Sequence, residues 1–141
     1  MEVFMGSWKL VSSENFDQYM DAISLSGAMK RYGSNMTTVV IFTQDGENIV
    51  IKTKMYEDTN RSYSISFKLG EEFNENTIDF RECRTVMNLQ DGKLVQLQKW
   101  DGEEATIIRQ VQDEKMISVR VFKHLLRNFL FFISLFLMNN C

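Results

Sequence analysis

Apolar and polar residues alternate with a period of two over most of the chain, which indicates β-strands. The alternation is clearest in Ile49 to Met55 and in Tyr63 to Leu69, and β-branched residues fill Thr37 to Thr43. Asp-Gly pairs at 45–46, 91–92 and 101–102 separate such stretches and are typical of tight hairpins. Closely spaced hairpins predict an antiparallel meander, and closing it into a barrel would protect its edges.

Near the N-terminus the period changes from that of a strand to that of a helix. Trp8 to Ser13 alternate as a first strand, after which Asn15 can cap a helix. The apolar face of this helix has the spacing i, i+3, i+4, i+7 and consists of Phe16, Tyr19, Met20 and Ile23. Gly27 to Tyr32 reads as a second short helix that Gly33 ends. Two helices ahead of many strands predict a helical cover over whatever the strands enclose.

Several motifs, all in one order, resemble the intracellular fatty-acid-binding protein family of the calycin superfamily. They are Gly6-Ser7-Trp8-Lys9-Leu10, Ser13 to Met20 (SENFDQYM), Asp45-Gly46, Ser66 to Phe73 (SFKLGEEF) and Gln98 to Gly102 (QKWDG). The resemblance covers residues 1 to about 117 and fades after Ile117. It implies an all-β fold, a ten-stranded antiparallel up-and-down β-barrel or β-clam, with a helix-turn-helix lid. We expect a single lipid-binding domain over 1–141, with the lid at about 15–33 and an atypical apolar tail at about 118–141.

Charge and cysteine content narrow the classes of function. A net charge of −3 argues against a nucleic-acid partner, because binding phosphates needs clustered Lys and Arg. Two cysteines, Cys83 and Cys141, are too few for a disulfide framework or a zinc site, and Cys83 reads as a buried structural thiol. We expect no cofactor and no metal. Met1 to Leu10 does not resemble a signal peptide, so the cytosol is the expected compartment, with the nucleus left open.

Arg109 lies in a predicted strand whose two faces differ in polarity. One face consists of Ala105, Ile107, Arg109 and Val111, and the other of Thr106, Ile108, Gln110 and Gln112. If the first face points inward, Arg109 is a cation in an apolar interior and needs an anion or several acceptors. If the second does, Arg109 lies in water, and the pattern alone favours neither. The resemblance implies the first, with Arg109 contacting a fatty-acid head group directly or through water.

A second basic anchor, which the family carries as Arg-x-Tyr in its last strand, is not intact. Counting forward in the register of Arg109 leads to Phe129 and Phe131, which cannot hold a carboxylate. Arg127 would fit after a turn shorter by two residues, so it is a candidate ligand-binding residue. Arg120, in Arg120-Val121-Phe122, is judged to come too early in the chain.

The resemblance also marks residues around the ligand chain and the portal. Phe16, Tyr19 and Met20 match lid positions that touch the ligand, although packing of the helix on the barrel would explain the same stripe. The portal set, in which Tyr56 is placed only approximately, is Met29, Tyr56, Ile78, Asp79 and Arg81. Lys30 and Arg31 form part of a basic patch, so transient membrane contact through the lid is a further expectation.

The apolar run from Phe129 to Met138 does not fit the family pattern. Its ten residues are about half of the ~20 that span a bilayer as a helix. Three interpretations stay open: a variant splice or gene model, a last strand that is more apolar than usual, and a membrane anchor.

The sequence as a whole predicts a monomeric, non-enzymatic carrier that binds long-chain fatty acids, or similar carboxylated lipids, and transports them in the cytosol. His124 is the only histidine and has no nucleophile at a recognisable spacing, so a small enzyme of lipocalin-like shape has little support. The alternatives are a retinoid carrier of the same fold and a variant with impaired barrel closure and binding.

Overall fold

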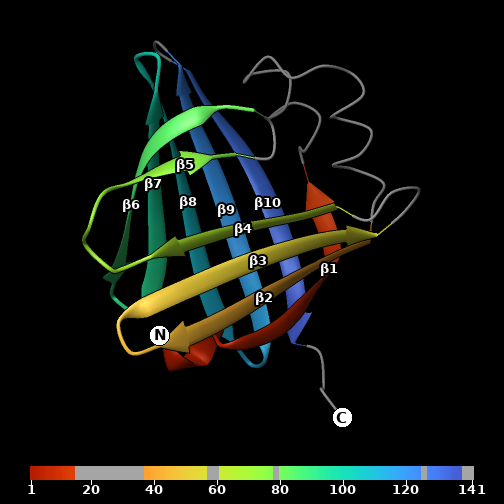
Figure 1. Cartoon of the computed structure of the whole chain (residues 1–141). Coiled ribbons are helices and arrows are strands. Elements are labelled where there is room, and N and C mark those ends of the chain that lie inside the picture. The colour runs from red at the N-terminus through yellow and green to blue at the C-terminus, as the bar shows by residue number, and fades with distance from the viewer. Residues whose placement is uncertain (15–36, 57–60, 78–79, 125–126, 138–141) are drawn as a thin grey trace.

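The computed structural model of the protein describes residues 1–14, 37–56, 61–77, 80–124 and 127–137, which form a short 3-10 helix and ten β-strands (Figure 1). The elements are η1 (Glu2–Phe4), β1 (Gly6–Glu14), β2 (Thr37–Asp45), β3 (Asn48–Tyr56), β4 (Arg61–Phe67), β5 (Phe73–Asn76), β6 (Glu82–Gln90), β7 (Lys93–Trp100), β8 (Glu103–Gln112), β9 (Lys115–His124) and β10 (Arg127–Leu137). The predicted helical lid at about 15–33 lies outside the described residues.

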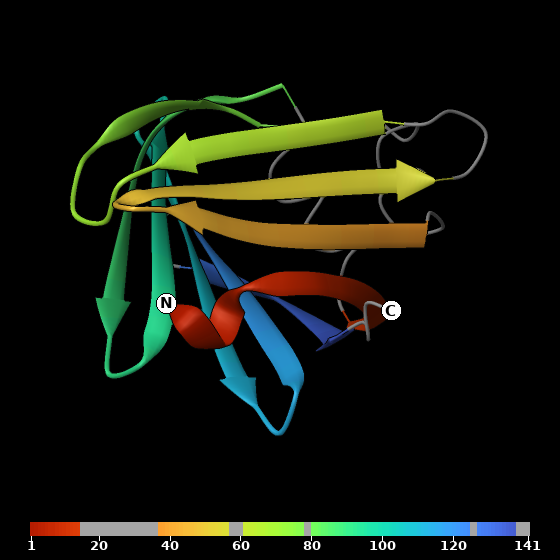
Figure 2. The same cartoon turned by 60° about the horizontal axis from the view of Figure 1, so that its bottom comes forward.

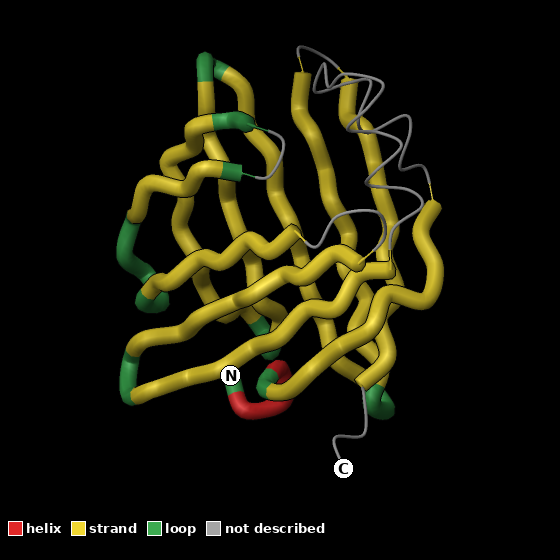
Figure 3. Tube along the Cα trace, turned by 45° about the vertical axis from the view of Figure 1, so that its right-hand side comes forward, coloured by secondary structure: helices red, strands yellow, loops and turns green. Residues whose placement is uncertain are grey.

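All of the strand pairs are antiparallel, and the strand order is β4-β3-β2-β1-β10-β9-β8-β7-β6-β5. Figure 3 shows the strands wrapping around a common interior. β4 and β5 are the two edges of this sheet and form no ladder with each other in the described part of the chain. The predicted ten-stranded antiparallel fold is therefore confirmed, and its open seam lies between β4 and β5.

The apolar run near the C-terminus forms the strand that joins the two halves of the sheet. β10 pairs with β9 from Arg127↔His124 to Phe136↔Lys115, and with β1 from Trp8↔Leu137 to Glu14↔Phe132. A bulge between Leu10 and Ser12 adjusts the register of β1. Of the three interpretations of this run, an apolar last strand agrees with the structure. No helix among the described residues is long and apolar enough to span a membrane.

The Asp-Gly pairs mark the predicted turns, although at the first of them Asp45 ends β2 and pairs with Asn48, so the turn residues are Gly46 and Glu47. Asp91 and Gly92 both have positive φ, as the turn of a two-residue hairpin requires, and Asp101 and Gly102 repeat this geometry. The prediction that the alternation runs on to Leu69 is wrong, because β4 ends at Phe67 and Leu69 is exposed. The amide of Glu71 donates to the carbonyl of Lys68, and Gly70 between them has φ +80°, so a β-turn ends the strand.

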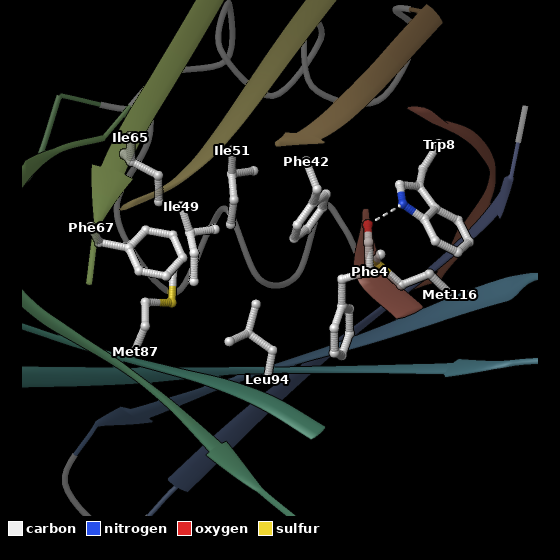
Figure 4. Packing of buried hydrophobic residues seen from close by; sticks show 10 residues of the cluster. All are labelled: Phe4, Trp8, Phe42, Ile49, Ile51, Ile65, Phe67, Met87, Leu94 and Met116. Atoms are coloured by element: carbon white, nitrogen blue, oxygen red, sulfur yellow. Dashed lines mark hydrogen bonds between the residues drawn. The ribbon is translucent and has the colours of Figure 1, made fainter. Parts of the chain in front are cut away.

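One end of the barrel interior is filled with apolar side chains (Figure 4). η1 lies across this end (Figure 2), where Phe4 stacks on Phe42 with ring centroids 6.2 Å apart. The indole Nε1 of Trp8 donates a 2.8 Å hydrogen bond to the carbonyl of Phe4, which fixes η1 to the first strand. The buried cluster is Phe4, Trp8, Phe42, Ile49, Ile51, Ile65, Phe67, Met87, Leu94 and Met116.

Candidate functional site

Beyond this apolar cluster, the inner face of β5 to β8 carries polar side chains. In β7, the buried positions are Leu94 and then, two and four residues later, Gln96 and Gln98. Glu75 of β5 and Thr85 of β6 are buried as well. Because a polar group removed from water is costly unless it is hydrogen-bonded, each of these side chains needs partners inside the barrel.

Glu75 is the acceptor on which these groups converge. Its side chain is 4% exposed, and its Oε1 accepts from Thr85 Oγ1 (2.8 Å), Gln96 Nε2 (3.0 Å) and Gln98 Nε2 (2.9 Å). The hydroxyl of Tyr63 donates to the other oxygen, Oε2, at 2.7 Å. Four donors from β4, β6 and β7 thus fix a buried carboxylate.

Arg109 extends this network to β8. Its Nη1 donates a 2.8 Å hydrogen bond to Oε1 of Gln96. Ala105 and Ile107 are buried and Gln110 is exposed, so the face that carries Arg109 points inward. Of the two orientations that the sequence left open, the one with the threonine and glutamine face inside is wrong.

The environment of Arg109 disfavours its charge. Burial, and next the positive charge of Arg120, lower the pKa of Arg109 to about 10, while the carboxylate of Glu75 acts in the opposite direction. Arg109 therefore stays protonated at neutral pH. An anion that binds next to this guanidinium would stabilise its charged form.

Arg81, predicted at the portal, lies at the other end of the same network. Its Nη1 donates to Oε1 of Gln98 at 3.4 Å, and its guanidinium carbon lies 4.4 Å from the centre of the Trp100 ring. Trp100 stacks in turn on Phe122. Arg109 and Arg81 are therefore joined through Gln96, Glu75 and Gln98.

The seam between β4 and β5 is crossed by side chains instead of a backbone ladder. The Tyr63–Glu75 hydrogen bond spans it, and so does the stack of Phe67 on Phe73, whose ring centroids lie 5.8 Å apart. A groove of about 200 Å³ runs along the seam and is lined by Ser64, Ile65, Ser66 and residues 73–76.

The other predicted site residues are not brought together by the described structure. Phe16, Tyr19, Met20, Met29, Ile78 and Asp79 lie outside the described residues. Tyr56 ends β3 and Arg127 begins β10 opposite His124, but the structure does not describe either side chain. All eight stay predictions as ligand contacts.

Arg120 lies in β9, one strand before the last, so it does come too early to be the arginine of an Arg-x-Tyr motif in the last strand. It is nevertheless the Cα partner of the buried Ile107, and its strand neighbours Ser118 and Phe122 are buried, so it lies on the inner face of β9, which the sequence did not indicate. The glutamines and Glu75 were missed outright. The one signal for the glutamines was the period of two in β7, in which Gln96 and Gln98 continue the face of Leu94, whereas Glu75 had none.

Cys83 is buried and forms no disulfide, as predicted. In the ranges that the structure describes, no group of three or more His, Cys, Asp or Glu side chains is placed to hold a metal ion.

Comparison with known proteins identifies the family to which this chain is similar. Residues 5–130 match the model of the lipocalin / cytosolic fatty-acid binding protein family. Over 124 residues the chain is 41% identical to fatty acid-binding protein 5 of Bos taurus, covering 88% of this chain and 90% of that protein.

Two solved structures are similar over nearly the whole fold. The fluorescent protein UnaG is 32% identical, with a TM-score of 0.87 over 97% of this chain and 98% of that one. A fatty acid binding protein of Schistosoma mansoni, solved in complex with arachidonic acid, is 30% identical, with a TM-score of 0.88 over 99% and 98%. The match to the family model and the identity to the bovine relative together show that this chain belongs to the lipocalin / cytosolic fatty-acid binding protein family.

Proposed function

We propose that the protein binds a long-chain fatty acid inside the barrel, with the carboxylate at Arg109, and carries it through the cytosol without chemical change. The observation that carries this proposal is Arg109 itself, a charged guanidinium on an inward face that it shares with the apolar residues Ala105, Ile107 and Val111. A carboxylate is the anion that matches its planar fork.

The donor inventory of Arg109 is compatible with such a contact. A guanidinium has five N–H donors, and the hydrogen bond to Gln96 uses one of them. The hydrocarbon chain would be held by apolar burial, at about 0.8 kcal/mol per CH₂ group. Affinity then comes mostly from the chain, whereas the preference for an acid over an alcohol comes from Arg109.

The relatives support the same class of ligand. The bovine relative is named as a fatty acid-binding protein, and the schistosome protein was solved with arachidonic acid. The lid contacts of Phe16, Tyr19 and Met20 and the portal contacts of Arg81 belong to this proposal, as does transient approach of the lid to membranes.

Displacement of a fluorescent fatty acid by oleate tests the proposal. Wild-type protein should bind oleate, and Arg109→Met should weaken this binding by about 1.5–3 kcal/mol, the range for a hydrogen bond to a charged group. Arg84→Met is the matched control, because Arg84 lies on the outer surface with its side chain 66% exposed.

Two further ligands sharpen the test. Oleyl alcohol has the same chain without the charge, so its affinity should be nearly equal in all three proteins. Retinol, also uncharged, addresses the alternative of a retinoid carrier. Wild-type protein that fails to bind oleate, or that prefers retinol to oleate, would overturn the proposed function.

A further inference from the structure

A second arginine lies beside Arg109 on the inner wall. Arg120 belongs to the face of β9 whose other members, Met116, Ser118 and Phe122, are buried. Its Cα partner in β8 is Ile107, which is 2% exposed. The Nε atom of Arg120 has no exposed surface. A long cationic side chain therefore enters the interior from β9.

The ladder between β8 and β9 makes the two arginines neighbours. Arg109 pairs directly with Ser118, and Arg120 follows two residues later on the same face. Such diagonal neighbours in an antiparallel pair lie about 7–8 Å apart at the backbone, within reach of each other's long side chains. The effect of the Arg120 charge on the pKa of Arg109 agrees with this proximity.

The two arginines act on each other as like charges inside the barrel. Arg120 acts on Arg109 as a like charge and lowers its pKa. Glu75 acts the other way, but its two oxygens already accept four hydrogen bonds from neutral donors, and it meets Arg109 through Gln96. An anion placed between the two guanidinium groups would relieve their repulsion.

On its other side, Arg120 has Phe131 of β10 as its Cα partner. Phenylalanine has no group that could bind a carboxylate, so that position in β10 adds no competing acceptor and no additional donor. Within the described part of the chain, the two neighbouring cationic groups Arg109 and Arg120 thus come from β8 and β9.

We propose that Arg120 is a second ligand-binding residue, and that Arg109 and Arg120 together hold one carboxylate of a monoanionic lipid. This proposal rests on the proposed function and deepens it, because it assigns the second cationic group to β9. The pair makes the site selective for ionised acids over alcohols and esters of the same chain.

The test compares Arg120→Met, Arg109→Met, the double variant and the exposed control Arg84→Met, with oleate and oleyl alcohol as probes. Arg120→Met should lose about tenfold in oleate affinity, which equals about 1.4 kcal/mol, and change its affinity for oleyl alcohol less than twofold. Because both arginines contact one carboxylate, the double variant should lose less than the product of the two single losses.

An unchanged oleate affinity in Arg120→Met, with Arg109→Met impaired, would overturn the assignment of Arg120 and leave the proposed function standing. Equal losses for oleate and oleyl alcohol would overturn it too, because Arg120 would then only shape the barrel. Wild-type protein that does not bind oleate would instead refute the proposed function itself.

If Arg120→Met does not fold, Arg120→Lys and Arg120→Gln are compared instead. Lysine keeps the charge and should keep most of the preference for oleate over oleyl alcohol, whereas glutamine should lose it. The same preference in both variants would refute the proposal.

Discussion

Removing the interior charge of Arg109 should make the ligand-free protein more stable while it weakens binding. Arg109→Met replaces a guanidinium with an apolar side chain that still fills part of the space. The substitution should thus lower the affinity for the ligand and raise the free energy of unfolding of the ligand-free protein. The two quantities are measured in separate experiments.

The magnitude follows from the pKa of Arg109. Its fall from the ordinary value of an arginine to about 10 corresponds to about 3.5 kcal/mol by which folding disfavours the charged form, at about 1.4 kcal/mol per pH unit. Against this, the substitution removes the hydrogen bond to Gln96, which is worth about 1.5–3 kcal/mol because its donor is charged. The ligand-free variant should therefore gain about 0.5–2 kcal/mol of unfolding free energy at pH 7.

The gain should also depend on pH. Below pH 10 both the folded and the unfolded wild-type chain carry the proton on Arg109, so the free-energy cost of burying its charge is at its maximum. Above pH 10 the folded state releases this proton before the unfolded state does, so the unfolded state binds more protons and the penalty for the buried charge falls as pH rises. The advantage of Arg109→Met should shrink by about 1 kcal/mol between pH 9 and pH 11.

Urea unfolding of delipidated protein, followed by tryptophan fluorescence and far-UV circular dichroism, measures the effect. Arg109→Lys, which keeps a positive charge, should not gain stability, and neither should the exposed control Arg84→Met. An Arg109→Met variant that is no more stable than wild type at pH 7 would show that the interior accommodates the charge without an anion, and the electrostatic argument for a ligand would fail.

Two further predictions concern the scaffold. Glu75→Leu leaves the buried donors of Thr85, Gln96 and Gln98 without their acceptor, so it should lower the free energy of unfolding in urea by about 2–4 kcal/mol. The control Glu72→Leu, on the exposed surface, should lower it by less than about 0.5 kcal/mol. Equal losses in the two variants would mean that the network does not stabilise the fold. A chain ending at Asn128 lacks most of the strand between β1 and β9 and should lose its cooperative unfolding transition, while a chain ending at Leu137 should keep it; a cooperative transition in the shorter chain would show that β10 is dispensable.

The strands and hairpins could be predicted from the sequence because their signals are local. Alternation over Ile49 to Met55 placed buried residues on one face of β3, and each Asp-Gly pair supplied the positive φ of a tight turn. The end of β4 was missed, since Leu69 continues the apolar period and only the turn at Gly70 takes it out of the sheet.

The orientation of Arg109 and the role of Arg120 depend on register, which the sequence does not show. The β8–β9 turn at Asp113 and Glu114 has positive φ at both residues and no glycine, so nothing in its sequence marks it as a two-residue hairpin. Without that turn, the pairing of Arg109 with Ser118 cannot be counted, and Arg120 cannot be placed beside it.

Glu75 was missed for a related reason. Its strand is four residues long and reads Phe73-Asn74-Glu75-Asn76, so polar residues surround a glutamate that would normally be solvated. The donors that stabilise its buried carboxylate lie between 10 residues (Thr85) and 23 residues (Gln98) away in the chain. Such a network is a property of the folded sheet and has no local pattern.

The position of the second arginine also explains how an apolar last strand is compatible with an ionic site. β10 joins β9 to β1 through backbone hydrogen bonds, which do not require polar or charged side chains in β10. If the second cationic group comes from Arg120 in β9, β10 need not supply one, and phenylalanine at 129 and 131 is compatible with carboxylate binding. Arg127→Gln separates the two arrangements: unchanged oleate affinity, together with a loss in Arg120→Met, would place the ionic chemistry on β8 and β9 and leave β10 the task of closing the sheet.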